Sequence, residues 1–130
     1  MTARLTYNQM VVGTLSTAEA DRVFQALADS TRRDILTRAI EREQSVSALA
    51  GRYEMSFAAV QKHVAVLERA GLVRKQRQGR EQIVHANTPT LRRVVELLDA
   101  YEQLWIQRTT QIADLLAGEE GAEHGRHHDP

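Results

Sequence analysis

The sequence contains no cysteine, which excludes disulfide bonds, thiolate metal sites and thiol redox switches. Aromatic residues make up only 5%, so a core must be built mainly from Leu, Val, Ile and Ala, which favours helices. No apolar run is long enough to span a membrane, and the first fifteen residues lack the sustained apolar segment of a signal peptide. We therefore expect a cytoplasmic protein with no membrane contact.

Neither positive nor negative charge is in excess, because 17 Lys and Arg residues balance 17 Asp and Glu residues. A net charge of zero disfavours indiscriminate binding to nucleic acid, but it does not say where the charges lie. The 130 residues are enough for one hydrophobic core, and the composition of 42% apolar and 26% charged residues is that of a globular domain.

Helical periodicity predicts two helices in the first third of the chain. Ser16 and Glu19 have the spacing of a capping box and open a helix over residues 17–28. Ser30 is the predicted N-cap of a second helix. The side chains that this second helix is predicted to bury are Ile35, Leu36 and Ile40.

The next two predicted helices have the arrangement of a helix-turn-helix. Ser45 opens a short helix that ends at Ala50, and the polar residues 51–54 form the turn. Ser56 is the predicted N-cap of a helix over residues 57–70, and Gly71 follows where a left-handed C-cap residue is wanted. The apolar side chains with helical spacing on this helix are Val60, Val64 and Leu67.

The periodicity then changes to that of strands. Residues 72–77 and 82–86 are strand-like runs on either side of residues 78–80, which predicts a β-hairpin. Residues 56–82 contain six basic side chains and only two acidic ones. The neutral total therefore hides a local basic surface on the fourth helix and the hairpin.

A last helix is predicted from Thr88 and Pro89 to about residue 116. Its apolar stripe is larger than a small helical core can cover, and such patches usually mark an interface. The stripe residues predicted to form a dimer interface are Leu98, Tyr101, Trp105, Ile112 and Leu116. The predicted domains are an N-terminal arm (1–15), a DNA-binding and dimerisation domain (16–117) and a disordered polar tail (118–130).

This order of elements predicts a mainly α-helical winged helix-turn-helix fold, in which the hairpin is the wing and the long C-terminal helix makes a homodimer. The predicted partner is double-stranded DNA, because a helix of about 14 residues fills a major groove. Gln61 can pair with adenine, Lys62 with guanine or phosphate, and Arg80 with the backbone or a minor groove. For His63 a phosphate contact and a packing role are both open. The predicted DNA-binding residues are Ser56, Phe57, Ala58, Gln61, Lys62, His63, Arg77 and Arg80.

Two stretches of sequence resemble the ArsR/SmtB-type winged-helix repressors. Residues 24–36 read FQALADSTRRDIL, and residues 55–73 read MSFAAVQKHVAVLERAGLV. The resemblance covers about residues 20–117, and residues 7–11 together with Trp105 are similar to one subgroup. It implies repression at a promoter by a homodimer whose first and last helices form the interface, which adds Phe24 to that surface. It also implies, for many members, release of DNA when a metal or another effector binds.

No metal site and no cofactor is predicted. The family's thiolate metal motif belongs on the third helix, where residues 46–51 read VSALAG and contain no ligand, and residues 88–117 contain no His. His124, His127 and His128 lie in the polar tail, where a weak affinity for Zn²⁺ or Ni²⁺ is the alternative to a plain solvated segment. Which effector, if any, acts on the protein is open.

Two other classes of function are the alternatives to a DNA-binding regulator. No catalytic triad spacing, phosphate-binding glycine loop or HExxH string is present, which disfavours an enzyme. A winged-helix module that binds a protein instead of specific DNA is the main alternative. It would show no salt-steep, sequence-selective binding of a duplex.

Overall fold

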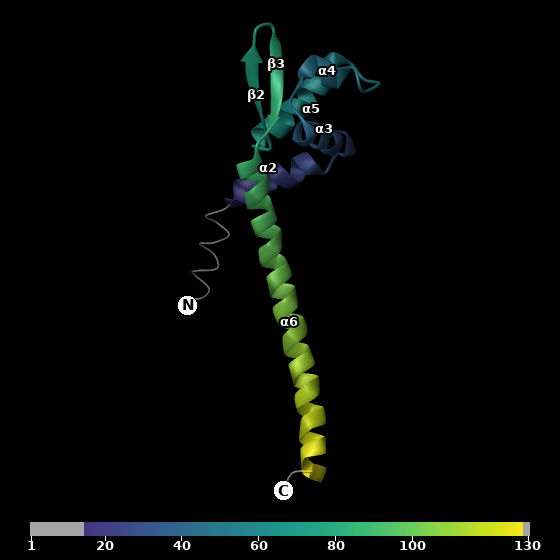
Figure 1. Ribbon diagram of the computed structural model, residues 1–130, viewed down its shortest axis with the longest axis vertical. Helices are drawn as coiled ribbons and strands as arrows, with labels where there is room; N and C mark the ends of the chain where they lie inside the picture. Colours follow the sequence, from purple (N-terminus) through teal and green to yellow (C-terminus); the bar gives the residue numbers. More distant parts are fainter. Residues whose placement is uncertain (1–14, 129–130) are drawn as a thin grey trace. The chain divides into compact units, whose positions relative to one another are not determined.

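A computed structural model of the chain describes residues 15–128, with side chains described as far as residue 118. The elements, drawn in Figure 1, are α2 (Thr17–Leu27), α3 (Ser30–Glu41), β1 (Gln44–Ser45), α4 (Val46–Ala50), α5 (Phe57–Arg69), β2 (Val73–Gln78), β3 (Glu81–Ala86) and α6 (Thr88–His128). The chain divides into two compact units between Glu96 and Leu97. The predicted arm lies outside the described residues except for Leu15. Within residues 15–128 no helix is both long and apolar enough to cross a membrane.

The helix starts follow from local capping. The Ser16 hydroxyl accepts a hydrogen bond from the Glu19 N–H (3.1 Å), and the Glu19 carboxylate accepts one from the Ser16 N–H (2.9 Å), so the predicted capping box is confirmed. For α3 the predicted cap is wrong by one residue. Asp29, not Ser30, is the N-cap, and its carboxylate accepts from the Arg32 N–H at 3.0 Å.

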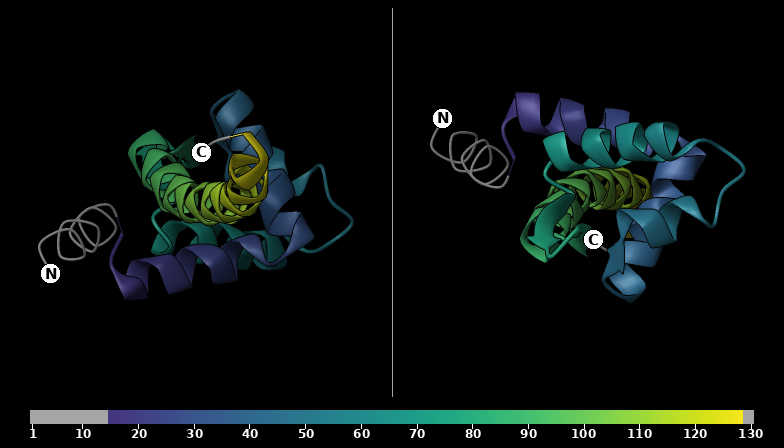
Figure 2. Two further views of the ribbon diagram at one scale, coloured as in Figure 1. Left: turned by 90° about the horizontal axis from the view of Figure 1, so that it is seen from below. Right: turned by 90° about the horizontal axis from the view of Figure 1, so that it is seen from above.

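The core of the first unit is formed by the inner faces of α2, α3, α5 and the strands. Helices α2 and α5 lie side by side (Figure 2) and contact each other. Ile40 was predicted to be buried but is 54% exposed, and Ala39 is buried instead. Residues 35, 36 and 39 share one face of a helix, whereas residue 40 lies a further 100° around it. Among the fully buried side chains are Val23, Ile35, Leu49, Val60, Val64, Leu67, Leu72 and Val84.

The sheet has three antiparallel strands in the order β1-β3-β2. Strand β1, which the sequence did not reveal, pairs Gln44 with Val84 and Ser45 with Ile83. In the hairpin Gln78 pairs with Glu81, so the turn is the two-residue loop Gly79–Arg80. Gly79 has φ +63°, which suits the first position of a type II′ turn. The β2–β3 hairpin is called the wing below.

Helix α5 begins and ends as predicted. The Ser56 hydroxyl accepts from the Ala59 N–H at 3.1 Å. At the other end Gly71 adopts φ +78°, and the N–H groups of Gly71 and Leu72 donate to the carbonyls of Glu68 (2.9 Å) and Leu67 (3.0 Å). This is the Schellman motif, and it turns the chain directly from α5 into β2.

Helix α6 is longer than predicted. It runs for 41 residues to His128, whereas the apolar stripe predicted an end near residue 116, and it continues into the segment predicted to be a disordered tail. A physical reason is that the Glu, Ala and Arg residues after Gly118 favour a helix, while each of the three glycines at 118, 121 and 125 costs only about 1 kcal/mol. The end of the apolar stripe shows where the apolar side chains end, and the helix can continue beyond it.

Candidate nucleic-acid interface

A groove lies between the N-terminal part of α5 and the tip of the wing. Its volume is about 290 Å³, and α4 forms a further wall. The lining residues are Val46, Ser47, Phe57, Gln61, Arg77, Arg80, Glu81 and Gln82. This α5–wing groove therefore unites four residues that the sequence predicted to contact DNA: Phe57, Gln61, Arg77 and Arg80.

The outer face of α5 carries the predicted side chains. Ser56, Ala58, Gln61 and Lys62 are exposed, because the opposite face is held in the core by apolar residues. Phe57 is 46% exposed in the first turn, although it is large and apolar. The Ser56 hydroxyl oxygen serves the helix as a cap, which leaves its O–H free to donate outward.

The wing tip places two cations beside α5. Arg77 and Arg80 are both exposed, and within the described residues neither forms an ion pair. The Arg77 Nε donates to the Gly79 carbonyl at 3.2 Å, which holds this side chain across the turn. Both guanidinium groups are therefore available to an anion that approaches the groove.

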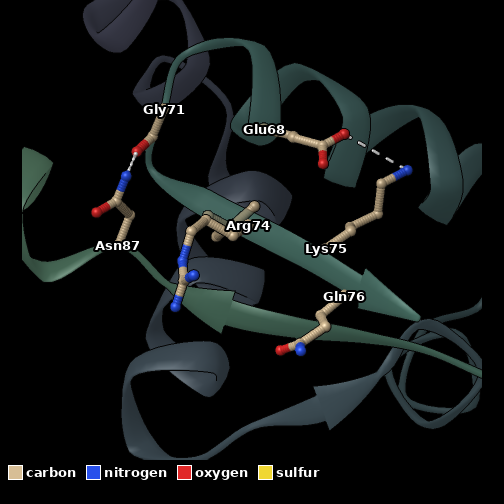
Figure 3. A pocket seen from close by; sticks show the side chains of 7 residues that line it. Glu68, Gly71, Arg74, Lys75, Gln76 and Asn87 are labelled. Carbon is tan, nitrogen blue, oxygen red and sulfur yellow. Dashed lines mark hydrogen bonds and ion pairs between the residues drawn. The ribbon is translucent and has the colours of Figure 1, made fainter. Parts of the chain in front are cut away.

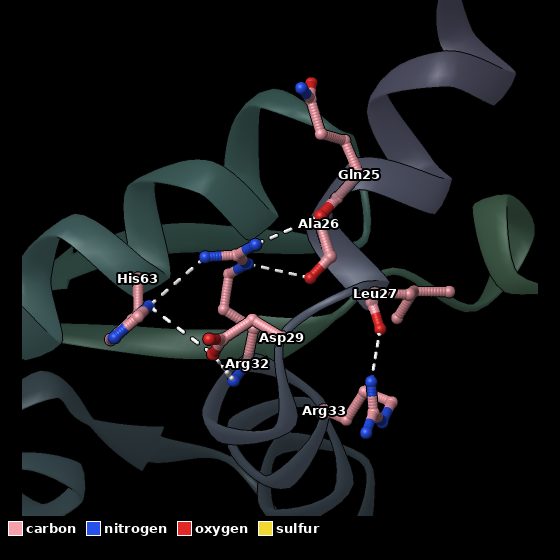
Figure 4. Close-up of polar contacts among 7 residues, drawn as sticks. All are labelled: Gln25, Ala26, Leu27, Asp29, Arg32, Arg33 and His63. Carbon is pink, nitrogen blue, oxygen red and sulfur yellow. Dashed lines mark hydrogen bonds and ion pairs between the residues drawn. The ribbon is translucent and has the colours of Figure 1, made fainter.

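His63 differs from its neighbours Gln61 and Lys62. Figure 4 shows its ring turned towards the loop between α2 and α3, and its side chain is only 24% exposed. The His63 Nδ1 lies 3.5 Å from a terminal nitrogen of Arg32 and 3.9 Å from the Asp29 carboxylate. The structure thus does not bring His63 together with the residues of the groove.

A second polar cluster, which the sequence analysis missed, fixes the turn of the helix-turn-helix. The Tyr53 hydroxyl donates to the Asp34 carboxylate at 2.6 Å, and the Arg38 Nε donates to the same oxygen at 2.9 Å. The Arg38 guanidinium also lies 5.8 Å from the centre of the Tyr53 ring. Burial and the bond to Asp34 raise the pKa of Tyr53 to about 12, and the bonds from Tyr53 and Arg38 lower the pKa of Asp34. Only the Asp34–Arg38 spacing was visible in the sequence.

A further hollow lies at the other end of α5, beside the base of the wing (Figure 3), with a volume of about 530 Å³. There Lys75 lies 3.6 Å from the Glu68 carboxylate, and the Asn87 amide donates to the Gly71 carbonyl at 2.9 Å. Arg74 also lines this hollow. The six basic residues within the range 56–82 therefore do not form one continuous surface, because Arg74 and Lys75 lie away from the α5–wing groove.

The residues predicted to form a dimer interface are exposed. Phe24 lies on the outer face of α2 in the first unit. In the second unit, which is helical from Leu97 to His128, every apolar stripe residue is about half exposed or more. Leu98, Trp105 and Ile112 recur every seven residues and so share one face of α6. Ile106, which was not among the residues predicted for this interface, is also exposed.

Metal ligands do not gather in the described part of the chain, where no group of three His, Cys, Asp or Glu residues could hold an ion. The side chains of His124, His127 and His128 lie outside the described residues. His85 is mostly buried on β3 with its Nδ1 3.5 Å from the Glu43 carboxylate.

Comparison with known proteins agrees with this architecture. Residues 27–76 match a family model described as a helix-turn-helix domain. The protein named uncharacterized HTH-type transcriptional regulator YuzN, of Bacillus subtilis, is 36% identical over 83 residues, which cover 58% of this chain and 90% of YuzN.

Two solved structures share the fold. The ArsR-like transcriptional regulator from Rhodococcus sp. RHA1 is 35% identical, with a TM-score of 0.69 over 77% of this chain and 94% of its own. The homodimeric winged helix-turn-helix DNA-binding domain of Mb0332 from Mycobacterium bovis is 26% identical, with a TM-score of 0.55 over 66% of this chain and 80% of its own. The predicted winged helix-turn-helix fold is confirmed, and the chain belongs to the ArsR family of DNA-binding transcriptional regulators.

Proposed function

We propose that this regulator is a homodimeric repressor that acts in the cytoplasm and binds a pseudo-palindromic promoter site. The observation that carries the proposal is the convergence of Phe57 and Gln61 of α5 with Arg77 and Arg80 of the wing on one groove. Side chains that contact base edges and side chains that bind phosphates can then contact the same stretch of duplex. Residues 16–117 form the functional domain in this proposal.

Helix α5 is the proposed recognition helix. Its 13 residues span about 20 Å, and its exposed N-terminal half can enter the major groove. Gln61 can make two hydrogen bonds to adenine, and Lys62 can bind guanine or a phosphate. Phe57 and Ala58 offer apolar contact to a thymine methyl group, while Ser56 offers a hydroxyl donor.

The wing supplies contacts that hold the protein on DNA without reading sequence. Arg77 and Arg80 are cations at the tip of a short, exposed hairpin, and phosphate contacts of this kind set register and orientation. With Lys62, they give three candidate phosphate partners per protomer. A dimer that used all six would show a salt slope of about −5.

The exposed face of α6 supports a dimer. A stripe of Leu, Tyr, Trp and Ile side chains would remain in water in a single chain, and apolar surface of this kind usually marks an interface. The Mb0332 domain is described as homodimeric. A two-fold dimer would bind two half-sites about 10 base pairs apart, and occupying a promoter in this way would block transcription.

The test begins with selection of duplexes from a random library by the full-length protein. Fluorescence anisotropy then compares the selected duplex with a scrambled one at several salt concentrations. A preference of ~10³-fold or more and an inverted-repeat consensus would support the proposal. Comparable weak binding of both duplexes would favour the alternative, a winged-helix module that binds a protein. Transcription in vitro from a promoter with the selected site separates a repressor from an activator.

Single substitutions distinguish the contacts that recognise bases from the contacts that bind phosphates. Gln61→Ala should reduce the preference for the selected duplex, with little change in the salt slope. Arg80→Gln should weaken binding to both duplexes and reduce the magnitude of the salt slope by about 2 per dimer. The matched control is Arg74→Gln, which removes the same charge at the base of the wing and should leave the slope unchanged.

A further inference from the structure

The side chain of Arg32 on α3 links the C-terminal end of α2 to α5 by hydrogen bonds. Helix α2 ends at Leu27, so its last carbonyls lack donors within the helix. The Arg32 guanidinium donates to two of them, those of Ala26 (2.7 Å) and Gln25 (3.0 Å). Its remaining terminal nitrogen lies 3.5 Å from the His63 Nδ1 on α5 (Figure 4).

The direction of this last hydrogen bond follows from chemistry. A guanidinium group has donors and no acceptor, so Nδ1 of His63 must accept. A ring that accepts at Nδ1 has its N–H at Nε2. The carboxylate of Asp29, the N-cap of α3, lies 3.9 Å from the same Nδ1, which is beyond hydrogen-bond distance.

We propose that His63 is a positioning residue for DNA recognition, which acts through Arg32 to fix the rotation of α5 about its axis. The proposal rests on the proposed function, in which α5 contacts bases. Of the two roles open for His63, it assigns the packing role and not a phosphate contact.

The geometry explains why such a bond would matter. Consecutive helical residues differ by 100°, so His63 faces inward while Gln61 and Lys62 face outward on the same turn. The apolar contacts of Val60 and Val64 are non-directional and permit small rotations. The bond from Arg32 is directional. A hydrogen bond from Gln61 to a base edge needs the correct distance and angle, so loss of the Arg32–His63 bond should weaken sequence reading.

Arg33 offers a matched control. It is adjacent to Arg32 and donates to the last carbonyl of the same helix, that of Leu27, at 2.7 Å. In the described part of the chain it makes no hydrogen bond to α5. Arg33→Gln thus removes a bond at the end of α2 without touching the link to the recognition helix.

The experiment measures the affinities of wild type, His63→Ala, His63→Asn, Arg32→Gln, Arg33→Gln and the double variant His63→Ala/Arg32→Gln. Each binds the selected and the scrambled duplex in anisotropy titrations at several salt concentrations, and thermal unfolding defines the temperature at which all are folded. We expect the preference for the selected duplex to fall about tenfold in His63→Ala and in Arg32→Gln, and no further in the double variant. His63→Asn should restore most of it, because its amide oxygen can accept from Arg32. Arg33→Gln should lower the melting temperature and keep the preference.

Three results would overturn the proposal: an unchanged preference in His63→Ala, no rescue by His63→Asn, or full additivity in the double variant. A lower salt slope in His63→Ala with a normal Arg32→Gln would assign His63 to a phosphate contact instead. If wild type itself shows no preference, the proposed function fails. If wild type prefers its site and the His63 variants do too, only the positioning role fails.

Discussion

Trp105 offers the sharpest test of the dimer face, because it is the only tryptophan in the sequence and is 68% exposed in the single chain. A tryptophan side chain has roughly 250 Å² of surface, of which about 170 Å² would then be open to a partner. At ~25 cal/mol per Å², burying that area is worth about 4 kcal/mol. A two-fold interface buries the residue twice, so the upper limit is about 8 kcal/mol per dimer.

The expected effect of Trp105→Ala follows from this limit. If the interface covers only half of the available area, the dimer still loses about 4 kcal/mol, which raises its dissociation constant by about 10³-fold. Sedimentation equilibrium over a dilution series measures this constant directly. In wild type, emission from Trp105 should shift to longer wavelengths as dilution separates the subunits, since no other tryptophan contributes.

Gln103→Ala is the matched control. Gln103 is exposed on α6 and lies two residues, or about 200°, around the helix from Trp105. Its substitution should leave the dissociation constant within a factor of a few. If Trp105→Ala and Gln103→Ala give the same constant, or if the Trp105 emission does not change on dilution of a dimeric wild type, the face assigned to the interface is wrong.

Three further predictions concern stability. Gly71→Ala should cost about 1–2 kcal/mol in urea unfolding, because φ is +78° there, while a new Cβ would make only ordinary contact, at 3.5 Å, with Thr90. Ser16→Ala should cost about 1 kcal/mol in the same assay, since it removes the hydroxyl of the capping box. Hydrogen bonds lower the pKa values of Glu19, Asp29 and Asp34, so their stabilisation is complete above about pH 5 and is lost as the pH falls through the folded-state pKa values. The melting temperature should therefore fall between about pH 4 and pH 2, and a flat profile there would contradict this reasoning.

Features set by neighbouring residues could be predicted from the sequence. The Ser16–Glu19 capping box, the Ser56 cap and the left-handed Gly71 each depend on a few consecutive residues whose chemistry allows few alternatives. At the start of α3 two neighbouring residues offer the same chemistry, and the predicted cap was the wrong one. Asp29 and Ser30 are adjacent and equally good N-caps, so only the backbone could decide between them.

Features set by distant residues could not be predicted in this way. Strand β1 has only two residues, and it exists because β3, some 40 residues later, offers its free edge. Tyr53 and Asp34 are 19 residues apart, and Arg32 and His63 are 31 residues apart, so no periodicity reveals either contact. The sequence could name His63 as a residue of the recognition helix but could not say which way its ring would turn.

The neutral net charge of the chain is compatible with specific DNA binding, because the position of the charges matters more than their sum. Lys75 is neutralised by Glu68 at the base of the wing, and Glu81 lines the α5–wing groove beside Arg80. Such carboxylates weaken attraction to any phosphate backbone equally, whatever its sequence. The hydrogen bonds of Gln61 with bases do not depend on net charge, so their share of the binding energy increases. Glu81→Gln should therefore strengthen binding to the scrambled and the selected duplex by about the same factor, so that the preference between them is unchanged. A larger gain for the selected duplex would mean that Glu81 itself opposes base reading.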